Sequence, residues 1–289
     1  MSNPKLTIGM ATYDDAQGVW WTLASLRAHH VDPHDDDVEL LVIDDMPGGC
    51  EETRRVCALS SARYVRHSKN LGPAHAKNTI WEHARGEYVL MLDCHVLLVP
   101  DHIEYLLAGI EQDRVGSDMW VGPLRNESGA IIATELAPRI RGDFFGTWHV
   151  QASTELVRPV HAHGSAYAFM RRSRWPGFSN HFRGFAGEEI YIHDKVRQQG
   201  GSVIYHTALG WVHRFARFGA VPYKLTLNDK CRNYLIAAYE CGWNVEQFAT
   251  YFAKRLPPDQ MTSIVYDVEG IYPGIMTAHP SGPRFEALD

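Results

Sequence analysis

The spacing of apolar residues predicts alternating strands and helices over the first 113 residues. Short apolar runs predict strands at 6–11, 38–44, 62–67 and 87–92. Apolar residues three or four positions apart, such as Val19, Leu23 and Leu26, are typical of the helices expected at 16–29, 49–60, 74–84 and 101–113. Because helical crossovers join parallel strands, we expect an α/β fold with a mainly parallel, Rossmann-like sheet flanked by helices.

Beyond residue 120 the pattern is less regular. Strands are predicted at 121–124, 130–133 and 165–170, within a mixed sheet. Residues 139–160 have no clear period, and long ordered connections of this kind are usually functional or mobile. From about Pro257 the chain is rich in proline, glycine and polar residues, which predicts a partly irregular C-terminal extension over 257–289.

Composition narrows the class of protein. The chain has 289 residues, of which 45% are hydrophobic, and a formal net charge of −6. This charge argues against binding nucleic acid by charge alone, although a local basic groove is compatible with it. The five cysteines lack framework spacing and fit free thiols in a reducing compartment. With no apolar run of ~18 residues and no visible signal peptide, we expect a soluble, cytoplasmic protein without a membrane partner.

Polar residues follow four of the predicted strands. They are Thr12, Tyr13 and Asp14, then Asp44 and Asp45, then His67 to Asn70, then Asp93 to His95. Ligands of parallel α/β sheets bind outside the carboxyl ends of the strands, so these residues should converge on one crevice. A single strand end of this kind is more often a solvated loop or a helix cap, but four together predict a binding site.

The segment Asp93-Cys94-His95 is the most specific of these strand ends. Side chains two positions apart point to the same face, so Asp93 and His95 can bind one ligand while Cys94 points away. A carboxylate oxygen with an imidazole nitrogen suits Mn²⁺ or Zn²⁺. An isolated pattern of this kind is usually a surface loop, and the rest of the chain decides between the two interpretations.

Two later segments add candidate site residues. Glu188 and Glu189 follow a glycine-rich turn at the start of a predicted helix. They either complement the helix dipole or line a pocket whose glycines let the backbone approach a ligand. His213 lies beside aromatic residues in the segment 209–215, which follows a strand predicted at 202–206, and it is either a second imidazole ligand or an ordinary core histidine.

The chain resembles the nucleotide-sugar glycosyltransferases of the GT-A fold, in the manner of family 2, over roughly residues 5–240. The first half matches that family at 11–14 (Ala-Thr-Tyr-Asp), 42–45 (Val-Ile-Asp-Asp), 70–72 (Asn-Leu-Gly), 76–78 (Ala-Lys-Asn) and 86–89 (Gly-Glu-Tyr-Val). Further motifs are most similar to the polypeptide N-acetylgalactosaminyltransferases, at 92–95 (Leu-Asp-Cys-His), 185–189 (Phe-Ala-Gly-Glu-Glu), 211–213 (Trp-Val-His) and 228–232. This resemblance implies a GT-A domain over 1–256, with a nucleotide-binding half at about 1–100 and an acceptor half at about 101–256.

The resemblance also implies a reaction and a set of site residues. A hexose such as GalNAc, GlcNAc, Glc or Gal would move from a UDP-sugar to an acceptor hydroxyl, with Mn²⁺, or alternatively Mg²⁺, as the metal. Asp93, His95 and His213 would hold the metal, assisted by Arg214 or Arg217, and Asp44 would accept from the uracil N3–H. The UDP-sugar would lie against Thr12, Tyr13, Asp14, Asp44, Asn70, Gly72, Lys77, Asn78 and Asp93. Glu188 or Glu189 would be the base of an inverting enzyme, whereas the peptide-modifying relatives favour retention.

The acceptor stays open at this stage. Phe185, Ala186 and Glu189 depart from the Trp-Gly-Gly-Glu-Asn segment of the relatives, which leaves sugar selectivity undecided. Basic and aromatic residues could hold phosphates and stack a base, so a 5-hydroxymethylpyrimidine in viral DNA, within a host cytoplasm, is one acceptor. These residues are 171–175, Arg139, Arg141, His149, His161 and His163. Polysaccharides, small glycosides and proteins are the alternative acceptors. The alternative functions are a non-catalytic sugar- or nucleic-acid-binding module and a sugar-nucleotide pyrophosphorylase. A pyrophosphorylase would need a glycine-rich basic signature after the first strand, and residues 11–18 do not contain one. The oligomeric state is left open.

Overall fold

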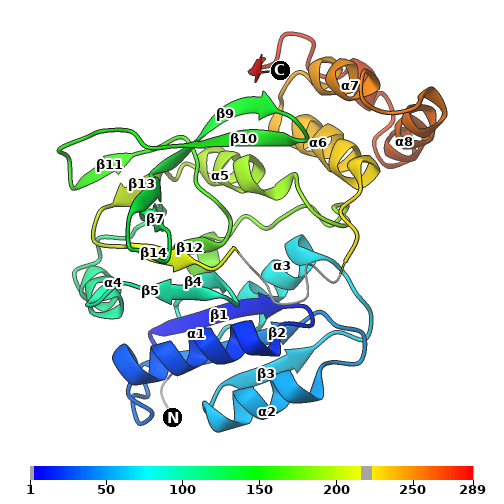
Figure 1. Ribbon diagram of the computed structural model, residues 1–289. Coiled ribbons are helices and arrows are strands. Elements are labelled where there is room, and N and C mark those ends of the chain that lie inside the picture. Colours follow the sequence, from blue (N-terminus) through cyan, green and yellow to red (C-terminus); the bar gives the residue numbers. More distant parts are fainter. Residues whose placement is uncertain (1–2, 216–222, 289) are drawn as a thin grey trace.

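An eight-stranded sheet forms the centre of the computed structural model, which describes residues 3–215 and 223–288 (Figure 1). The strand order is β11-β13-β6-β12-β4-β1-β2-β3. Strands β1 (Leu6–Thr12), β2 (Val38–Asp44), β3 (Arg63–Arg66) and β4 (Tyr88–Asp93) are mutually parallel. The others are β6 (Met119–Val121), β11 (Val157–Pro159), β12 (Tyr167–Arg171) and β13 (Val203–His206). Of the eight strands, only β11 and β12 run antiparallel to their neighbours. The predicted α/β fold with a mainly parallel sheet is therefore confirmed.

Helices cover both faces of this sheet because its central strands are apolar on both sides. Along β4, Leu90 and Leu92 join one buried cluster while Val89 and Met91 join the other. The first cluster packs against α1 (Ala16–His29) and α4 (His102–Glu111), and the second against α3 (Pro73–His83). With α2 (Glu51–Leu59), these helices overlap the four predicted ranges.

Two smaller sheets stand beside the main one. The first has the order β5-β14-β7-β8, from β5 (Val96–Leu98), β14 (Trp211–His213), β7 (Leu124–Arg125) and β8 (Ile131–Ala133). The second has the order β10-β9-β15, from β9 (Glu135–Arg141), β10 (Phe144–His149) and β15 (Glu286–Leu288). The segment 139–160, expected to be an aperiodic connection, therefore forms much of a β-hairpin. Its alternation is hidden because Phe145 faces the core while Phe144 and Trp148 on the other face are also aromatic.

The C-terminal third is helical. It contains α6 (Leu227–Cys241), α7 (Val245–Ala253), α8 (Pro258–Ile271) and a short 3-10 helix at Ile275–Thr277. Earlier in the chain, a short 3-10 helix at Arg172–Arg174 follows β12, and α5 (Glu188–Gln198) precedes β13. The expectation of an irregular extension is wrong for α8, whose Ile264 and Val268 lie one turn apart and are buried in the same cluster as α6. Among the described residues, no helix combines the length and apolar character needed to cross a bilayer.

Candidate active site

A cavity of about 960 Å³ lies at the carboxyl ends of β1 and β4. Its lining also includes the start of α3, the start of α5, strand β10 and the end of β14. The convergence expected from the strand ends is thus present. Several of the residues singled out from the sequence line it, namely Thr12, Tyr13, Asn70, Gly72, Lys77, Asp93, His95, Glu188, Glu189 and His213.

Asp44 does not belong to this lining, which corrects its assignment to the uracil. Its carboxylate is fully buried and accepts from the amides of Met46 and Cys50, at 3.0 and 2.7 Å, and from the Tyr64 hydroxyl, at 2.7 Å. It therefore holds the turn after β2. The neighbouring Asp45 lines the cavity instead and accepts from Asn70 Nδ2 at 2.9 Å.

Asn78 and Asp14 also lie outside the lining. The Asn78 side chain accepts from the Phe178 amide at 2.8 Å and donates to the Phe178 carbonyl at 2.9 Å, so it anchors the segment after β12. Asp14 is exposed, with a left-handed φ of 50° that aspartate tolerates better than most residues. Arg214 is turned toward Asp15, at 3.6 Å, and Arg217 lies outside the described residues.

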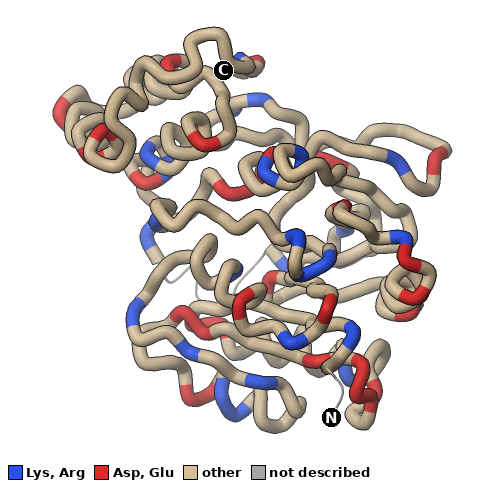
Figure 2. The backbone as a smooth tube through the Cα atoms, turned by 180° about the vertical axis from the view of Figure 1, so that it is seen from behind, with Lys and Arg blue, Asp and Glu red and all other residues tan. Residues whose placement is uncertain are grey.

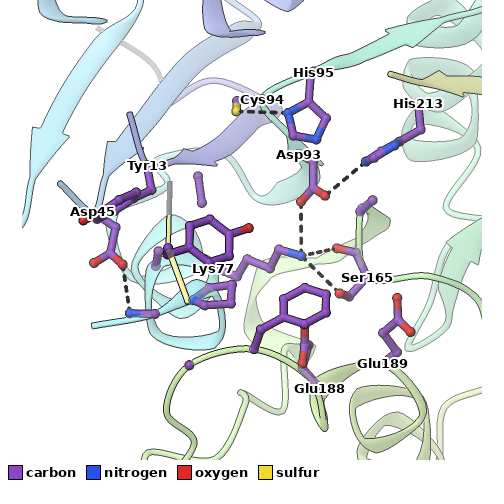
Figure 3. Close-up of a pocket in the computed structure, with 18 of the residues that line it drawn as sticks. Tyr13, Asp45, Lys77, Asp93, Cys94, His95, Ser165, Glu188, Glu189 and His213 are labelled. Carbon is purple, nitrogen blue, oxygen red and sulfur yellow. Dashed lines mark hydrogen bonds and ion pairs between the residues drawn. The ribbon is translucent and has the colours of Figure 1, made fainter. Parts of the chain in front are cut away.

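Asp93, His95 and His213 form a compact cluster at one end of the cavity (Figure 3). Each offers one ligand atom, and these atoms lie within 4.8 Å of one another. Antiparallel pairing of β14 with β5 sets His213 opposite Val96, which brings position 213 beside His95. The two imidazole rings meet edge to face at 4.7 Å, and His213 Nε2 lies 3.5 Å from Asp93 Oδ2.

This donor set fits a borderline divalent metal. One carboxylate and two imidazoles are ligands that Mn²⁺ and Zn²⁺ accept, and the buried Nδ1 of His213 has no hydrogen-bond partner among the described residues. Burial opposes the charge on Asp93, but Lys77 and the two histidines hold the pKa of that carboxyl far below its usual value. Burial also opposes the charge on His95, yet the contact with Asp15 raises the pKa of His95 to about 10. Metal binding to His95 would therefore release a proton.

Lys77 connects the cluster to the start of α5. It is 5% exposed, and its Nζ lies 3.2 Å from Asp93 Oδ1 and donates to the carbonyl and hydroxyl of Ser165 at 2.9 and 3.1 Å. Burial lowers the pKa of Lys77, but Asp93 and Glu188 outweigh it, so the pKa is raised and the side chain stays charged. These contacts hold the ammonium group at the floor of the cavity that Lys77 lines.

Glu188 and Glu189 begin α5 on the same side of the cavity (Figure 3). Burial raises the pKa of both carboxyls, and repulsion from Glu188 helps to raise the pKa of Glu189 to about 8. Near neutral pH, Glu189 can therefore exist in both protonation states, as a group that transfers protons must.

Strand β10 supplies a part of the lining that sequence reasoning missed. Phe144, Gly146 and Trp148, which we call the β10 wall, line the cavity together with Thr147. Phe144 and Trp148 are each 41% exposed. A Cβ on Gly164 would lie 2.4 Å from the Trp148 indole and 3.6 Å from Glu189 Oε1, so glycine at this position leaves room for the indole.

The sheet, the cavity at its carboxyl edge and the carboxylate–histidine cluster define a glycosyltransferase domain of the GT-A fold. The chain belongs to glycosyl transferase family 2, whose family model matches residues 7–183. It is 26% identical over 114 residues to an uncharacterised glycosyltransferase of Rickettsia conorii, a match that covers 39% of this chain and 18% of that protein.

Two solved structures share the fold. One is GalNAc-T7 with UDP, GalNAc and Mn²⁺, at a TM-score of 0.68 and 15% identity, covering 94% of this chain and 58% of that one. The other is residues 1–349 of TarS from S. aureus, at a TM-score of 0.51 and 14% identity, covering 93% of this chain and 73% of that one. The GT-A assignment made from the sequence is confirmed.

Proposed function

We propose that the protein transfers a sugar from a UDP-sugar to an acceptor hydroxyl with the help of a divalent metal, most simply Mn²⁺. The observation that carries this proposal is the cluster of Asp93, His95 and His213 at the edge of a cavity large enough for donor and acceptor together. Glycosyl transferase family 2 and the UDP and Mn²⁺ in the GalNAc-T7 structure support it.

The nucleoside would lie at the β1 end of the cavity. Tyr13 offers an aromatic ring, and the buried Oγ1 of Thr12 has no hydrogen-bond partner among the described residues. Asp45 and Asn70 complete this end. The diphosphate would lie toward Asp93, His95 and His213, where a bound metal would neutralise the charge that the leaving phosphate gains. Lys77, held by Asp93 and Ser165, fixes the orientation of the Asp93 carboxylate.

The proton of the acceptor hydroxyl has two possible destinations. Glu189 lines the cavity, and its raised pKa makes it a usable base near neutral pH. In a retaining reaction the leaving phosphate would take the proton instead, and Glu189 would position the acceptor. The donors we propose are the UDP conjugates of GalNAc, GlcNAc, glucose and galactose.

The β10 wall favours an acceptor with a ring face. A saccharide and a 5-hydroxymethylpyrimidine in DNA both meet this requirement, because either can stack on an indole. Charge favours the saccharide. Arg171 lies opposite Tyr88, at the end of β4 far from Asp93, and contacts Glu87 and Asp113. Acidic and basic residues are interspersed in the rear view (Figure 2).

Two of the basic residues of the hairpin are also paired with acids, whereas a third, Arg141, lines the cavity. Arg139 lies 2.7 Å from Glu286, and His149 lies 2.8 Å from Glu135. A DNA strand would need unpaired cations along its phosphates, because phosphate neutralisation supplies much of its affinity. We therefore propose a glycan or glycoside acceptor, with hydroxymethylated DNA as the alternative.

Trp148→Ala is expected to raise KM for the acceptor about tenfold or more, since an aromatic stacking contact contributes about 1–3 kcal/mol. Hydrolysis of the UDP-sugar in the absence of acceptor should change less than about twofold. Initial rates with a panel of methyl glycosides, and with hydroxymethylated DNA, measure both quantities. An unchanged KM for the acceptor that proves active would place the acceptor elsewhere.

The proposed donor site is tested by calorimetry with UDP, with and without Mn²⁺. Wild type should bind UDP more tightly with Mn²⁺, and His95→Ala should abolish that difference because a ligand of the metal is lost. His34→Ala, on an exposed loop, is the matched control. An affinity for UDP that changes neither with Mn²⁺ nor with the substitution at His95 would refute metal dependence. Release of UDP from a panel of UDP-sugars then identifies the donor.

A further inference from the structure

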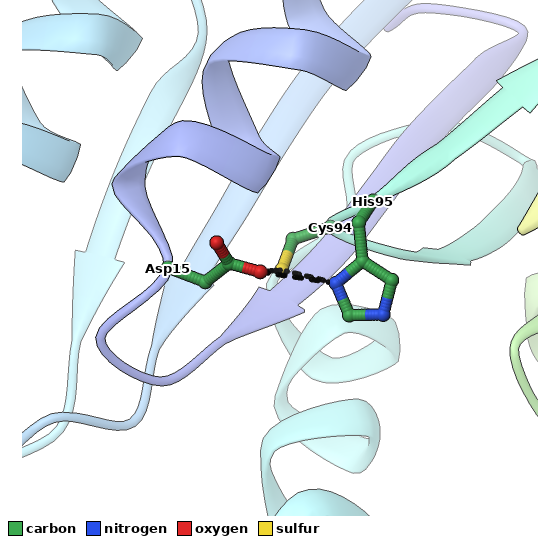
Figure 4. A group of neighbouring side chains, drawn as sticks. All are labelled: Asp15, Cys94 and His95. Atoms are coloured by element: carbon green, nitrogen blue, oxygen red, sulfur yellow. Dashed lines mark hydrogen bonds and ion pairs between the residues drawn. The ribbon is translucent and has the colours of Figure 1, made fainter. Parts of the chain in front are cut away.

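Asp15 lies beside Cys94 and His95 (Figure 4), and it is not among the residues that line the cavity. It is 7% exposed and precedes α1 as its N-cap, where Oδ1 accepts from the Gly18 amide at 3.0 Å. Its other oxygen, Oδ2, lies 3.1 Å from His95 Nδ1 and 3.7 Å from Cys94 Sγ. Asp15 thus touches both residues that follow Asp93.

The contact with Asp15 decides which nitrogen of His95 carries a proton. An ionised carboxylate has no hydrogen to donate, so the proton between Oδ2 and Nδ1 must sit on Nδ1. Because Nδ1 keeps its proton, the other ring nitrogen, Nε2, is the one that loses its proton on metal binding and presents a lone pair. A metal-binding histidine needs this arrangement, in which one nitrogen donates to a fixed acceptor and the other binds the metal.

The geometry points to Asp15 as a positioning residue that holds His95 in the tautomer with the proton on Nδ1 and so leaves Nε2 to bind the metal. This inference rests on the proposed metal-dependent function. Asp15 itself would touch neither metal nor substrate.

The carboxylate of Asp15 is held from several sides. A Cβ on Gly18 would lie 2.5 Å from Asp15 Oδ2 and 2.9 Å from the Cys94 carbonyl oxygen, so the helix start fits only because residue 18 is glycine. Arg214 Nη2, just beyond β14, lies 3.6 Å from Oδ1. These contacts connect the start of α1, the turn after β4 and the end of β14 through one carboxylate.

Asp15→Asn is the most informative variant, because its shape is unchanged while one hydrogen-bond role is reversed. Asparagine caps helices as well as aspartate does. With its oxygen kept on the Gly18 amide, its NH₂ group faces His95 Nδ1 and can only donate. The imidazole proton then moves to Nε2, which blocks metal binding.

Asp15→Ser gives a graded comparison. Serine also caps helices well, but its short side chain cannot reach His95, so neither tautomer is enforced. Affinity for Mn²⁺ alone, measured by calorimetry, should fall about 10–100-fold in Asp15→Asn, as is typical when the partner of a metal-binding histidine is lost, and less in Asp15→Ser. Simple structural damage would give the opposite ranking, since serine is the larger change. Equal affinity of wild type and Asp15→Asn would overturn the inference.

A second measurement does not depend on metal at all. In ¹⁵N-histidine NMR spectra of the metal-free protein, assigned with His95→Gln, the proton on Nδ1 should be present in wild type and absent in Asp15→Asn. A proton that stays on Nδ1 in the variant would also overturn the inference. Failure of the proposed function is recognised separately, as a wild type that binds no Mn²⁺.

Cys94→Ala tests whether Asp15 and Cys94 bind the ion directly. Asp15, Cys94 and His95 themselves lie close enough to hold an ion. If Asp15 acts only on the tautomer of His95, loss of the thiol should change Mn²⁺ affinity less than about threefold. A loss in Cys94→Ala as large as that in Asp15→Asn would mean that the ion is bound by Asp15 and Cys94 directly, and would replace the positioning role.

Discussion

Replacing Asp93 with asparagine is expected to lower the rate of sugar transfer by about 10²–10³-fold. Asp93 is the one carboxylate of the candidate metal cluster, and charge stabilisation of a leaving group by a metal contributes several kcal/mol. At about 1.4 kcal/mol for each factor of ten, this predicts the stated loss. The measurement is the initial rate of UDP release at saturating UDP-sugar and Mn²⁺, once the donor is known.

The control for this prediction is Asp36→Asn, which removes the same charge from an exposed loop and should leave the rate unchanged within a factor of two. Circular dichroism confirms that both variants are folded. A rate for Asp93→Asn within threefold of wild type would mean that the cluster has no part in catalysis, whatever its affinity for Mn²⁺.

Lys77→Met is expected to destabilise the fold by about 3–5 kcal/mol at pH 7. Lys77 is buried against Asp93, and its positive charge is also attracted by Glu188 and Glu189. Removing one partner of a buried ion pair leaves the charge of the other partner uncompensated. Urea unfolding followed by fluorescence measures the free energy of unfolding. The exposed Lys69→Met should change it by less than about 0.5 kcal/mol.

The loss of unfolding free energy in Lys77→Met, which we call the deficit, should depend on pH. Without the ammonium group, the pKa values of the nearby carboxyls rise in the folded state. A carboxyl with a raised folded-state pKa keeps its full contribution below the unfolded value and loses stability as pH rises through the folded value. The pKa of Glu189 is already raised to about 8 in the wild type. The deficit of Lys77→Met should therefore be larger at pH 8 than at pH 5, and a deficit that grows on acidification would contradict this explanation.

The main sheet could be predicted because its signals are local. Strands such as β4, with Leu90 and Leu92 on one face and Val89 and Met91 on the other, are continuous apolar runs bounded by polar residues. The hairpin of β9 and β10 lacked this signal because both of its faces carry large apolar side chains. The packing of α8 was missed because its flanking prolines and glycines suggested an irregular chain.

The residues of the site were predictable as a group but not by role. Asp44 and Asp45 are adjacent at a strand end, where successive side chains point in opposite directions, and the sequence alone does not say which faces the cavity. The turn after β2, not the strand, decides this by using the Asp44 carboxylate for its own amides. The contact of Lys77 with Asp93 likewise depends on how α3 packs on the sheet.

The pairing of β14 with β5 has a consequence for the order in which the candidate metal cluster is completed during synthesis. Asp93 and His95 belong to the first half of the chain, whereas His213 reaches them only through a ladder formed near the end of the GT-A region, outside residues 7–183 that match the family model. A chain that ends before residue 213 would therefore lack a complete cluster, even where its first four parallel strands are all present. Under the proposed function, such a chain would have no complete site at which to activate a sugar donor.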